Sequence, residues 1–256
     1  MNTIFYHPAT ADAALINPAD TVQPVEHFPE VCISTFSKQI IDKFAAFDCV
    51  EVIARLLTAN GEIPIYKINY GGKEFAFYLS LVGAPASVSC LEEVIAMGAK
   101  KFVFFGCCGV LADDLVGHRL IIPTSAVRDE GTSYHYAAPS EEIAPSPTVT
   151  ALLEKCLSKC GYPYITGKIW TTDAIYRETL TTISARKNSG CIAVDMEYSA
   201  LLAVAQYRNV PFAQFFYPAD SLDHNEWKPR DLTDYGLSNA QMYLALALEC
   251  GLEMSK

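Results

Sequence analysis

Residues 101–112 read KFVFFGCCGVLA, and this apolar stretch decides the fold. Its first part, Phe102–Phe105, is apolar at every position, which is typical of a central parallel strand that is buried on both faces. Gly106-Cys-Cys-Gly109 follows directly, and we expect it to form a loop beyond the carboxyl end of that strand. In α/β sheets, ligands bind beyond the carboxyl ends of the strands. The stretch therefore predicts the centre of a sheet and one wall of a binding site.

Strand-like and helix-like runs alternate on both sides of this stretch. Two β-rich runs, Ile63–Tyr70 and Glu74–Leu81, are joined by Gly71-Gly72, which is a hairpin signal. Apolar residues at helical spacing predict a helix over Ser87–Met97, and Gly98 would end it. The later elements are expected, in chain order, as strand Arg119–Val127, helix Thr148–Lys159, strands Ile165–Thr171 and Ile192–Val194, helix Met196–Tyr207, strand Phe212–Tyr217 and helix Asn239–Leu252.

This alternation predicts the fold class. Strands that alternate with helices of about ten or more residues imply a mostly parallel sheet that is covered on both sides. The sequence therefore predicts an α/β protein, a single-domain three-layer α/β/α sandwich around a mixed, mostly parallel sheet. The single domain would span residues 1–256. Several prolines in the first sixty residues indicate an irregular N-terminal arm, about residues 1–30, which is followed by a helix.

Composition and charge exclude several classes of protein. The chain has 29 acidic and 19 basic side chains, and a net charge of -10 argues against nucleic-acid binding, which needs clustered Lys and Arg. The longest apolar stretch, Phe102–Ala112, is about half of the roughly 20 residues that a membrane span requires. The N-terminus lacks the basic and apolar blocks of a secretory signal. Nine cysteines without framework spacing indicate reduced thiols, so we expect a cytoplasmic protein.

No metal site and no cofactor is predicted. Cys156 and Cys160 share a helix face, but no further Cys or His completes a tetrahedral set. The five histidines show no metal-ligand spacing. Backbone N–H groups of Gly106-Cys-Cys-Gly109 could hold an anion or a planar ring. The Lys-Ser/Thr pair of a phosphate loop is absent there.

Asp195-Met-Glu197 brings two carboxylates to the start of a helix, directly after an apolar strand. The exposed backbone N–H groups at a helix start favour negative charge. One interpretation is an N-cap, Asp195, with an ordinary first-turn glutamate behind it. The other is that Glu197 accepts hydrogen bonds from a substrate hydroxyl and supports a developing cation. Spacing alone leaves both open.

Asp220 and Cys107 are the other chemical candidates. Asp220 follows an unusually aromatic strand, and a carboxylic acid that desolvation keeps protonated can donate a proton to a leaving group. The alternative is a solvated loop residue near Asp223 and His224. Cys107 could be a nucleophile, but no histidine can be placed beside it, and a buried structural thiol is the commoner case.

Three motifs carry a family resemblance. Arg128–Pro139 (RDEGTSYHYAAP) is similar to the uridine phosphorylase branch, and Gly83–Ser87 (GAPAS) resembles a Gly-x-Pro-Ser turn. Val194-Asp-Met-Glu197 stands where relatives have the ribose-binding Val-Glu-Met-Glu. Together they resemble the nucleoside phosphorylase superfamily, which includes purine nucleoside phosphorylase, uridine phosphorylase and nucleosidases, over about residues 63–252. The resemblance implies cleavage of an N-glycosidic bond through an oxocarbenium-like state.

The resemblance also assigns roles around the sugar. Glu197 would bind the 2′- and 3′-hydroxyls, and Met196 would pack under the ribose. Asp195 would stand where a second ribose-facing acid usually is. Asp220 falls where purine-cleaving members have the acid that protonates N7, so a purine-type nucleoside is favoured. His7 would reach across a subunit boundary to the 5′-hydroxyl of the sugar that a neighbouring subunit binds. This contact implies a homodimer or a hexamer built as a trimer of dimers.

The base and acceptor positions follow in the same way. Thr179 and Thr181 replace the residues that read uracil, which argues against uridine. The arginines that bind phosphate in relatives are also missing, because Gly61 and Phe104 occupy two of the positions and the segment 16–21 (INPADT) has none. Losing three charge-assisted contacts of roughly 1.5–3 kcal/mol each should abolish useful phosphate affinity, so phosphate is a doubtful partner. Cys107 replaces a hydroxyl on the same side. The base slot would be lined by Cys108, Gly109, Ile175 and Tyr176.

Three functions therefore stay open. The favoured one is an enzyme that cleaves a purine-type nucleoside by hydrolysis or with an atypical acceptor. The second is conventional phosphorolysis, with phosphate held by Lys67, Arg128 or Arg177. The third is a nucleoside-binding or storage protein on the same scaffold, because a fold alone never establishes activity.

Overall fold

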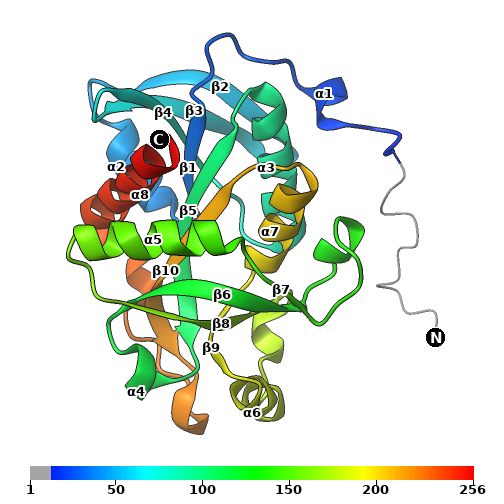
Figure 1. Cartoon of the computed structure of the whole chain (residues 1–256), viewed down its shortest axis with the longest axis vertical. Coiled ribbons are helices and arrows are strands. Elements are labelled where there is room, and N and C mark those ends of the chain that lie inside the picture. The colour runs from blue at the N-terminus through cyan, green and yellow to red at the C-terminus, as the bar shows by residue number, and fades with distance from the viewer. Residues whose placement is uncertain (1–12) are drawn as a thin grey trace.

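The fold is built around a mixed sheet that runs through the whole molecule (Figure 1). The computed structural model describes residues 13–256. In this part of the chain the sheet has ten strands, in the order β10-β6-β8-β9-β5-β1-β4-β3-β2, with β7 paired to β6. The strands are β1 Val31–Thr35, β2 Glu51–Thr58, β3 Gly61–Tyr70, β4 Lys73–Leu79, β5 Lys101–Val110, β6 Leu120–Asp129, β7 Glu142–Ile143, β8 Tyr164–Thr172, β9 Cys191–Asp195 and β10 Phe212–Ser221.

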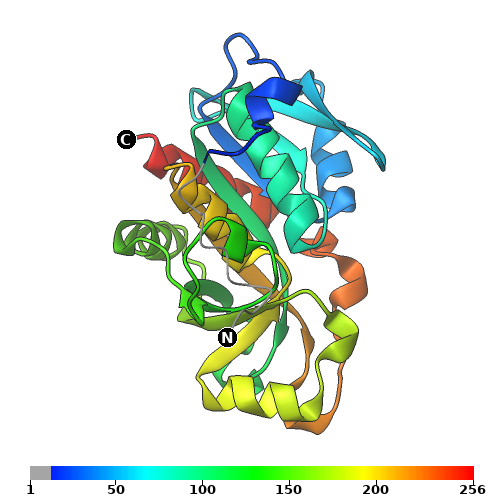
Figure 2. The ribbon, with the colours of Figure 1, turned by 90° about the vertical axis from the view of Figure 1, so that its right-hand side faces the viewer.

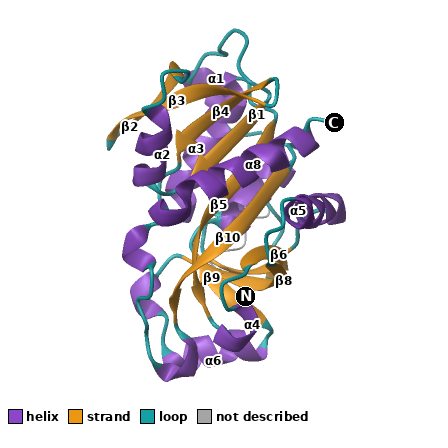
Figure 3. Ribbon diagram, turned by 90° about the vertical axis from the view of Figure 1, so that its left-hand side faces the viewer, coloured by secondary structure: helices purple, strands orange, loops and turns teal. Residues whose placement is uncertain are grey.

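Helices cover both faces of the sheet. Helices α3 and α7 pack on one face (Figure 2), and their apolar side chains belong to one buried cluster. Helices α2, α5 and α8 cover the other face (Figure 3), over a second cluster. The predicted α/β sandwich is therefore confirmed. The helices are α1 Pro18–Thr21, α2 Lys38–Ala45, α3 Ala84–Met97, α4 Asp113–Val116, α5 Pro147–Lys159, α6 Leu180–Asn188, α7 Tyr198–Tyr207 and α8 Ala240–Met254.

Strand β5 is the hub of the sheet because it pairs with three other strands. Its first half pairs in parallel with β1, and β10 runs parallel to it over almost its whole length. Its last residues pair with β9 in the antiparallel direction, Gly109 opposite Val194. Since β10 also pairs with β6, the strands β5, β9, β8, β6 and β10 close into a ring. This closure brings the carboxyl ends of β5, β9 and β10 together.

The expected loop at Gly106-Cys-Cys-Gly109 is wrong, since these residues are the second half of β5. The glycines serve close packing instead of a turn. A Cβ at Gly106 would lie 2.8 Å from the ring of Phe36. At Gly109 a Cβ would lie 2.6 Å from the side chain of Leu222. The segment 217–221, also expected as a loop, likewise belongs to β10, with a bulge between Pro218 and Asp220.

The N-terminal sixty residues differ most from the prediction. A helix was expected there and α2 confirms it, but β1 and β2 were missed. β1 has only five residues, all buried, and β2 alternates weakly because Leu56 is its only buried residue. The later strands and helices that the sequence predicted are confirmed with shifted ends, and α6 is an additional helix. Within residues 13–256 we find no helix with the length and apolar character that a bilayer crossing needs.

The burial of Phe104 predicts how strongly its substitution lowers the free energy of unfolding. Its side chain is fully buried, and its ring centroid lies 5.2 Å from that of Phe212. We expect Phe104→Ala to lower the free energy of unfolding by about 3–5 kcal/mol, because it opens a cavity in the core. Leu57→Ala, at a side chain that is 73% exposed, should change it by less than about 0.5 kcal/mol. Denaturant unfolding monitored by circular dichroism measures both, and equal losses would contradict the assignment.

Candidate active site

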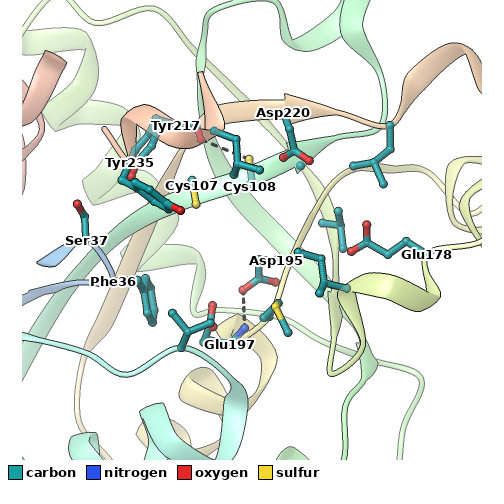
Figure 4. Close-up of a pocket in the computed structure, with 17 residues that line it drawn as sticks. Phe36, Ser37, Cys107, Cys108, Glu178, Asp195, Glu197, Tyr217, Asp220 and Tyr235 are labelled. Atoms are coloured by element: carbon teal, nitrogen blue, oxygen red, sulfur yellow. Dashed lines mark hydrogen bonds between the residues drawn. The ribbon is translucent and has the colours of Figure 1, made fainter. Parts of the chain in front are cut away.

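A cavity of about 250 Å³ lies where the carboxyl ends of the central strands meet. The carboxyl groups of Glu178, Asp195, Glu197 and Asp220 surround it (Figure 4). The segments that follow β1, β4 and β8 supply further walls, which agrees with the rule for ligand sites in α/β sheets. The lining residues are Phe36, Ser37, Val82, Cys107, Cys108, Gly109, Ile175, Glu178, Val194, Asp195, Met196, Glu197, Tyr217, Asp220, Leu222, Leu232 and Tyr235.

Glu197 is held at the start of α7 with its carboxylate in this cavity. Its side chain is 6% exposed, and Oε1 accepts a hydrogen bond of 2.7 Å from the backbone N–H of Gly83. Gly83 can serve here because its φ of +95° suits glycine. Burial, and then the charge of Asp195, raise the pKa of Glu197. The backbone N–H groups of Gly83 and Met196 oppose this rise, and the carboxylate still lines the cavity, where a ligand can reach it.

The carboxylate of Asp195 stabilises the turn that leads into α7. Its Oδ2 accepts hydrogen bonds from the backbone N–H groups of Glu197 at 2.9 Å and Tyr198 at 2.6 Å. Its Oδ1 accepts one of 2.7 Å from the hydroxyl of Thr171 on β8. Burial raises its pKa. The N-cap of α7 is Glu197 and not Asp195, but Asp195 does accept hydrogen bonds from the backbone at the helix start, and its side chain also reaches the cavity wall.

Asp220 faces the same cavity from β10, so the two acids that the sequence singled out share one site. Its Oδ2 accepts a hydrogen bond of 2.8 Å from the indole N–H of Trp227. The contact fixes one oxygen, and Oδ1 lies within 3.4 Å of the position that a Cβ on Gly109 would take. The bulge in β10 next to Asp220 turns this side chain relative to its neighbours.

Glu178 is a cavity residue that the sequence interpretation missed. It lies between the short 3₁₀ turn Ile175–Arg177 and helix α6, and no motif marks it. Burial, and then the charge of Asp220, raise the pKa of Glu178 to about 7. A glutamate after a strand end in an α/β sheet is the one signal that could have drawn attention to it, and this signal is weak.

The cysteines of β5 line the cavity as thiols. Burial, and then the charges of Glu197 and Asp220, raise the pKa of Cys107 to about 12. Such a thiol stays protonated at neutral pH, which argues against a nucleophilic role. Cys108 is buried, and its thiol donates to the backbone carbonyl of Tyr217 at 3.7 Å.

Two residues expected to contact substrate lie elsewhere. Phe104 is buried among the rings of the α3 and α7 face and does not line the cavity. The side chain of Tyr176 points into solvent, whereas its neighbour Ile175 reaches the wall. His7 falls outside the described residues.

Comparison with known proteins gives the family. A family model described as the Phosphorylase superfamily matches residues 31–247.

The chain belongs to the phosphorylase superfamily.

Proteins that are similar to this superfamily member are named as phosphorylases or as a nucleosidase. A guanosine phosphorylase of Halorubrum lacusprofundi is 24% identical over 157 residues, which covers 61% of this chain and 65% of the relative, less than two thirds of it. The structure of an AMP nucleosidase from Bacteroides thetaiotaomicron matches with a TM-score of 0.71 at 19% identity, covering 89% of this chain and 88% of that one. A uridine phosphorylase from Vibrio fischeri matches with a TM-score of 0.72 at 21% identity, covering 94% and 98%.

The resemblance drawn from the sequence is thereby confirmed, together with the assignment to a family of enzymes that cleave N-glycosidic bonds. Because both identities are low, the likeness to the two solved structures shows the fold alone. The superfamily model begins at Val31, the first residue of β1.

The sequence aligned segment 16–21 of this phosphorylase-superfamily chain with the phosphate-binding loop of relatives, but this segment lies away from the cavity. The segment 16–21 lies at a separate groove beside α3 and does not line the acidic cavity. Phe36 and Ser37, which follow β1, line it instead. The next residue, Lys38, pairs with Asp42 on the surface of α2.

Charge is distributed unevenly around the cavity. Four carboxyl groups line it, and none of its described lining residues is Lys, Arg or His. Lys187 pairs with Asp223 and Arg230 with Asp113, whereas Arg177, between the lining residues Ile175 and Glu178, is exposed. These ion pairs also involve two members of a group, Asp113, Asp223 and His224, whose ligand atoms lie within 4.8 Å of one another. The carboxylates of that group already have cationic partners.

The raised pKa of Glu197 makes stability depend on pH. Burial raises this pKa to about 8, whereas an unfolded glutamate titrates near about 4.3. The folded state therefore binds the proton more tightly, and this stabilising contribution is lost as pH rises through the folded pKa. Relative to the wild type, Glu197→Gln should gain stability on the order of a few kcal/mol between about pH 5 and pH 8.

Denaturant titrations at both pH values measure this difference. The Gln side chain can still accept the hydrogen bond from Gly83, so the fold is preserved. Exposed Glu141→Gln serves as the control and should track the wild type at both values. A constant difference between wild type and Glu197→Gln across this range would contradict the buried-acid assignment.

Proposed function

We propose that this protein cleaves the N-glycosidic bond of a purine-type nucleoside with water as the acceptor. The observation that carries the proposal is a single cavity that has Glu197 and Asp220 in its walls and no basic side chain among its described lining residues. Cleavage builds positive charge on the ribosyl group while electrons move onto the base. Acids on the two sides of the cavity suit these two needs, and an anionic acceptor does not suit four carboxyls.

In this proposal Glu197 binds the 2′- and 3′-hydroxyls through the oxygen that Gly83 leaves free. The positive charge that develops on the ribosyl group favours the ionised form of Glu197, and this carboxylate then stabilises the oxocarbenium-like state. Met196 packs under the sugar, and Asp195 acts as a positioning residue because its hydrogen bonds fix the turn that carries Glu197.

Asp220 protonates the departing base at N7, and the indole of Trp227 orients its carboxyl group. The base lies beside Cys108, Gly109 and Ile175, all of which line the cavity. Cys107 contributes a neutral wall near both acids. Water then attacks C1′ of the ribosyl group and gives free ribose, and the proton that this water loses restores the acid form of Asp220.

Conventional phosphorolysis is the second candidate, and the names of several relatives favour it. The three cations considered from the sequence do not support it. Lys67 pairs with Glu51 and Glu74 on the outer strands. Arg128 is buried and donates to Ser133, Ser140 and backbone carbonyls, and Arg177 is exposed at the end of the 3₁₀ turn.

We also propose that a second copy of this chain covers the mouth of the cavity. Large apolar side chains are exposed near it, among them Val82 at 62% and Tyr176 at 95%. A homodimer, or a hexamer built from dimers, would bury such surface. Light scattering of the purified protein tests this, and a monomer at assay concentration would exclude it.

The acceptor can be decided by measuring base release from guanosine, adenosine, inosine and uridine with and without phosphate. We expect release from a purine nucleoside at equal rates in both conditions, with free ribose as the product. Strict dependence on phosphate, with ribose 1-phosphate as the product, would favour phosphorolysis. Tight binding by calorimetry without any turnover would instead select the binding-protein alternative.

The roles of the two acids predict distinct losses. Asp220→Asn removes the proton donor and should lower kcat by about 10²–10⁴-fold. Glu197→Gln should lower kcat/KM by about 10²–10³-fold, because a charge that stabilises the transition state is lost. Asp48→Asn, at an exposed position, is the control. Unchanged rates in both variants, with the control also unchanged, would defeat the residue assignment.

A further inference from the structure

Glu178 is the acid of the cavity whose purpose the proposed reaction leaves open. It lines the cavity, and its side chain is half-buried. Its carboxyl group has no hydrogen bond and no ion pair with any residue of the described chain. A buried carboxylate without a partner is unfavourable, so the free protein lacks a group that this carboxyl could bind.

Among residues 13–256 no cation forms an ion pair with Glu178, and its neighbour Arg177 is exposed. Asp220 on β10 is close enough to act on Glu178 electrostatically, because burial and then the charge of Asp220 raise the pKa of Glu178. The cations of the neighbouring helix α6 are already paired, Arg186 with Asp129 and Lys187 with Asp223. A positive charge that pairs with Glu178 would therefore come from a ligand.

We propose that Glu178, together with Asp220, makes this cavity selective for ribosides whose base carries a fixed positive charge, such as a pyridinium or an N7-alkylated purine. The proposal rests on the proposed function of the same site. Two carboxylates flanking a cationic ring would neutralise it at short range, where the cavity excludes most water. Phe36, Tyr217 and Tyr235 also line the cavity, and aromatic faces attract cations.

The chemistry of such a substrate balances without a proton donor. When the bond between C1′ and nitrogen breaks, the electron pair stays on nitrogen and the cationic base leaves as a neutral molecule. Water adds to C1′ and loses one proton to a carboxylate, which passes it to solvent. The products are ribose, a neutral base and one proton. For this class Asp220 donates no proton and lies beside the cationic ring.

A matched pair of ribosides tests the charge preference directly. The pyridinium riboside of nicotinamide and its dihydropyridine form have the same heavy atoms, and only the first is a cation. Calorimetry with the full-length protein should show that the cation binds at least about tenfold tighter than the neutral form. Equal affinity, or tighter binding of the neutral form, would overturn the proposal.

Glu178→Gln should bring the two affinities together, because it removes the charge and keeps the shape. Glu141→Gln, an exposed match, should keep the wild-type ratio. A Glu178→Gln variant that is folded by circular dichroism and retains the full preference would overturn the role of Glu178. If this variant does not fold, Glu178→Asp, which keeps the charge, should retain a preference that the wild type shows.

The same samples separate this inference from the proposed function. If purine nucleosides are hydrolysed but the cation has no advantage, the inference fails and the function stands. If the cation is preferred in binding but no riboside, charged or neutral, releases its base, the function fails and the charge selectivity stands.

Discussion

The close approach of three strands at Gly109 is the constraint on which the site depends. Gly109 pairs with Val194 of β9 on one side and lies opposite Asp220 of β10 on the other. A Cβ there would come within 2.9 Å of the Val194 side chain and would collide with Leu222. Because glycine leaves this space free, β9 and β10 can both approach the end of β5. Their last residues then deliver carboxyl groups to one cavity, although they are distant in sequence.

This convergence carries an electrostatic cost that the rest of the fold must offset. Burial and mutual repulsion raise the pKa values of Glu178, Asp195 and Glu197, so the empty cavity holds its protons unusually tightly. Backbone hydrogen bonds reduce the cost for Asp195 and Glu197, and Glu178 has none. The two apolar clusters on the faces of the sheet provide the stability that tolerates such a site. Residues whose pKa values are perturbed in this way cluster at functional sites.

Sequence interpretation succeeded where the signal is local. The helical spacing around Val88 and Leu91 and the Gly71-Gly72 hairpin are visible in a short window, and both elements form as expected. The interpretation failed where the role of a residue depends on neighbours that are distant in the sequence. The glycines of Gly106-Cys-Cys-Gly109 look like a loop, yet they are needed because Phe36 and Leu222 pack against them. Asp195 and Glu197 could be found by motif and Asp220 by position, whereas Glu178 has no pattern around it. Assignment of Phe104 by position along its strand could not reveal that its ring turns into the core.

The distribution of cations around the site links the fold to its chemistry. Lys187 and Arg230 carry positive charge near the cavity, but Asp223 and Asp113 hold them outside its lining. The cavity therefore keeps an acidic wall instead of neutralising it internally. An enzyme accelerates a reaction only through interactions that are stronger in the transition state than in the ground state. An acidic wall has that property for a ribosyl group that becomes positive as its base departs, and it has the opposite effect on an approaching anion. It is on this ground that we propose water as the acceptor: the surface that favours bond cleavage would disfavour phosphate, whereas a neutral nucleophile could enter.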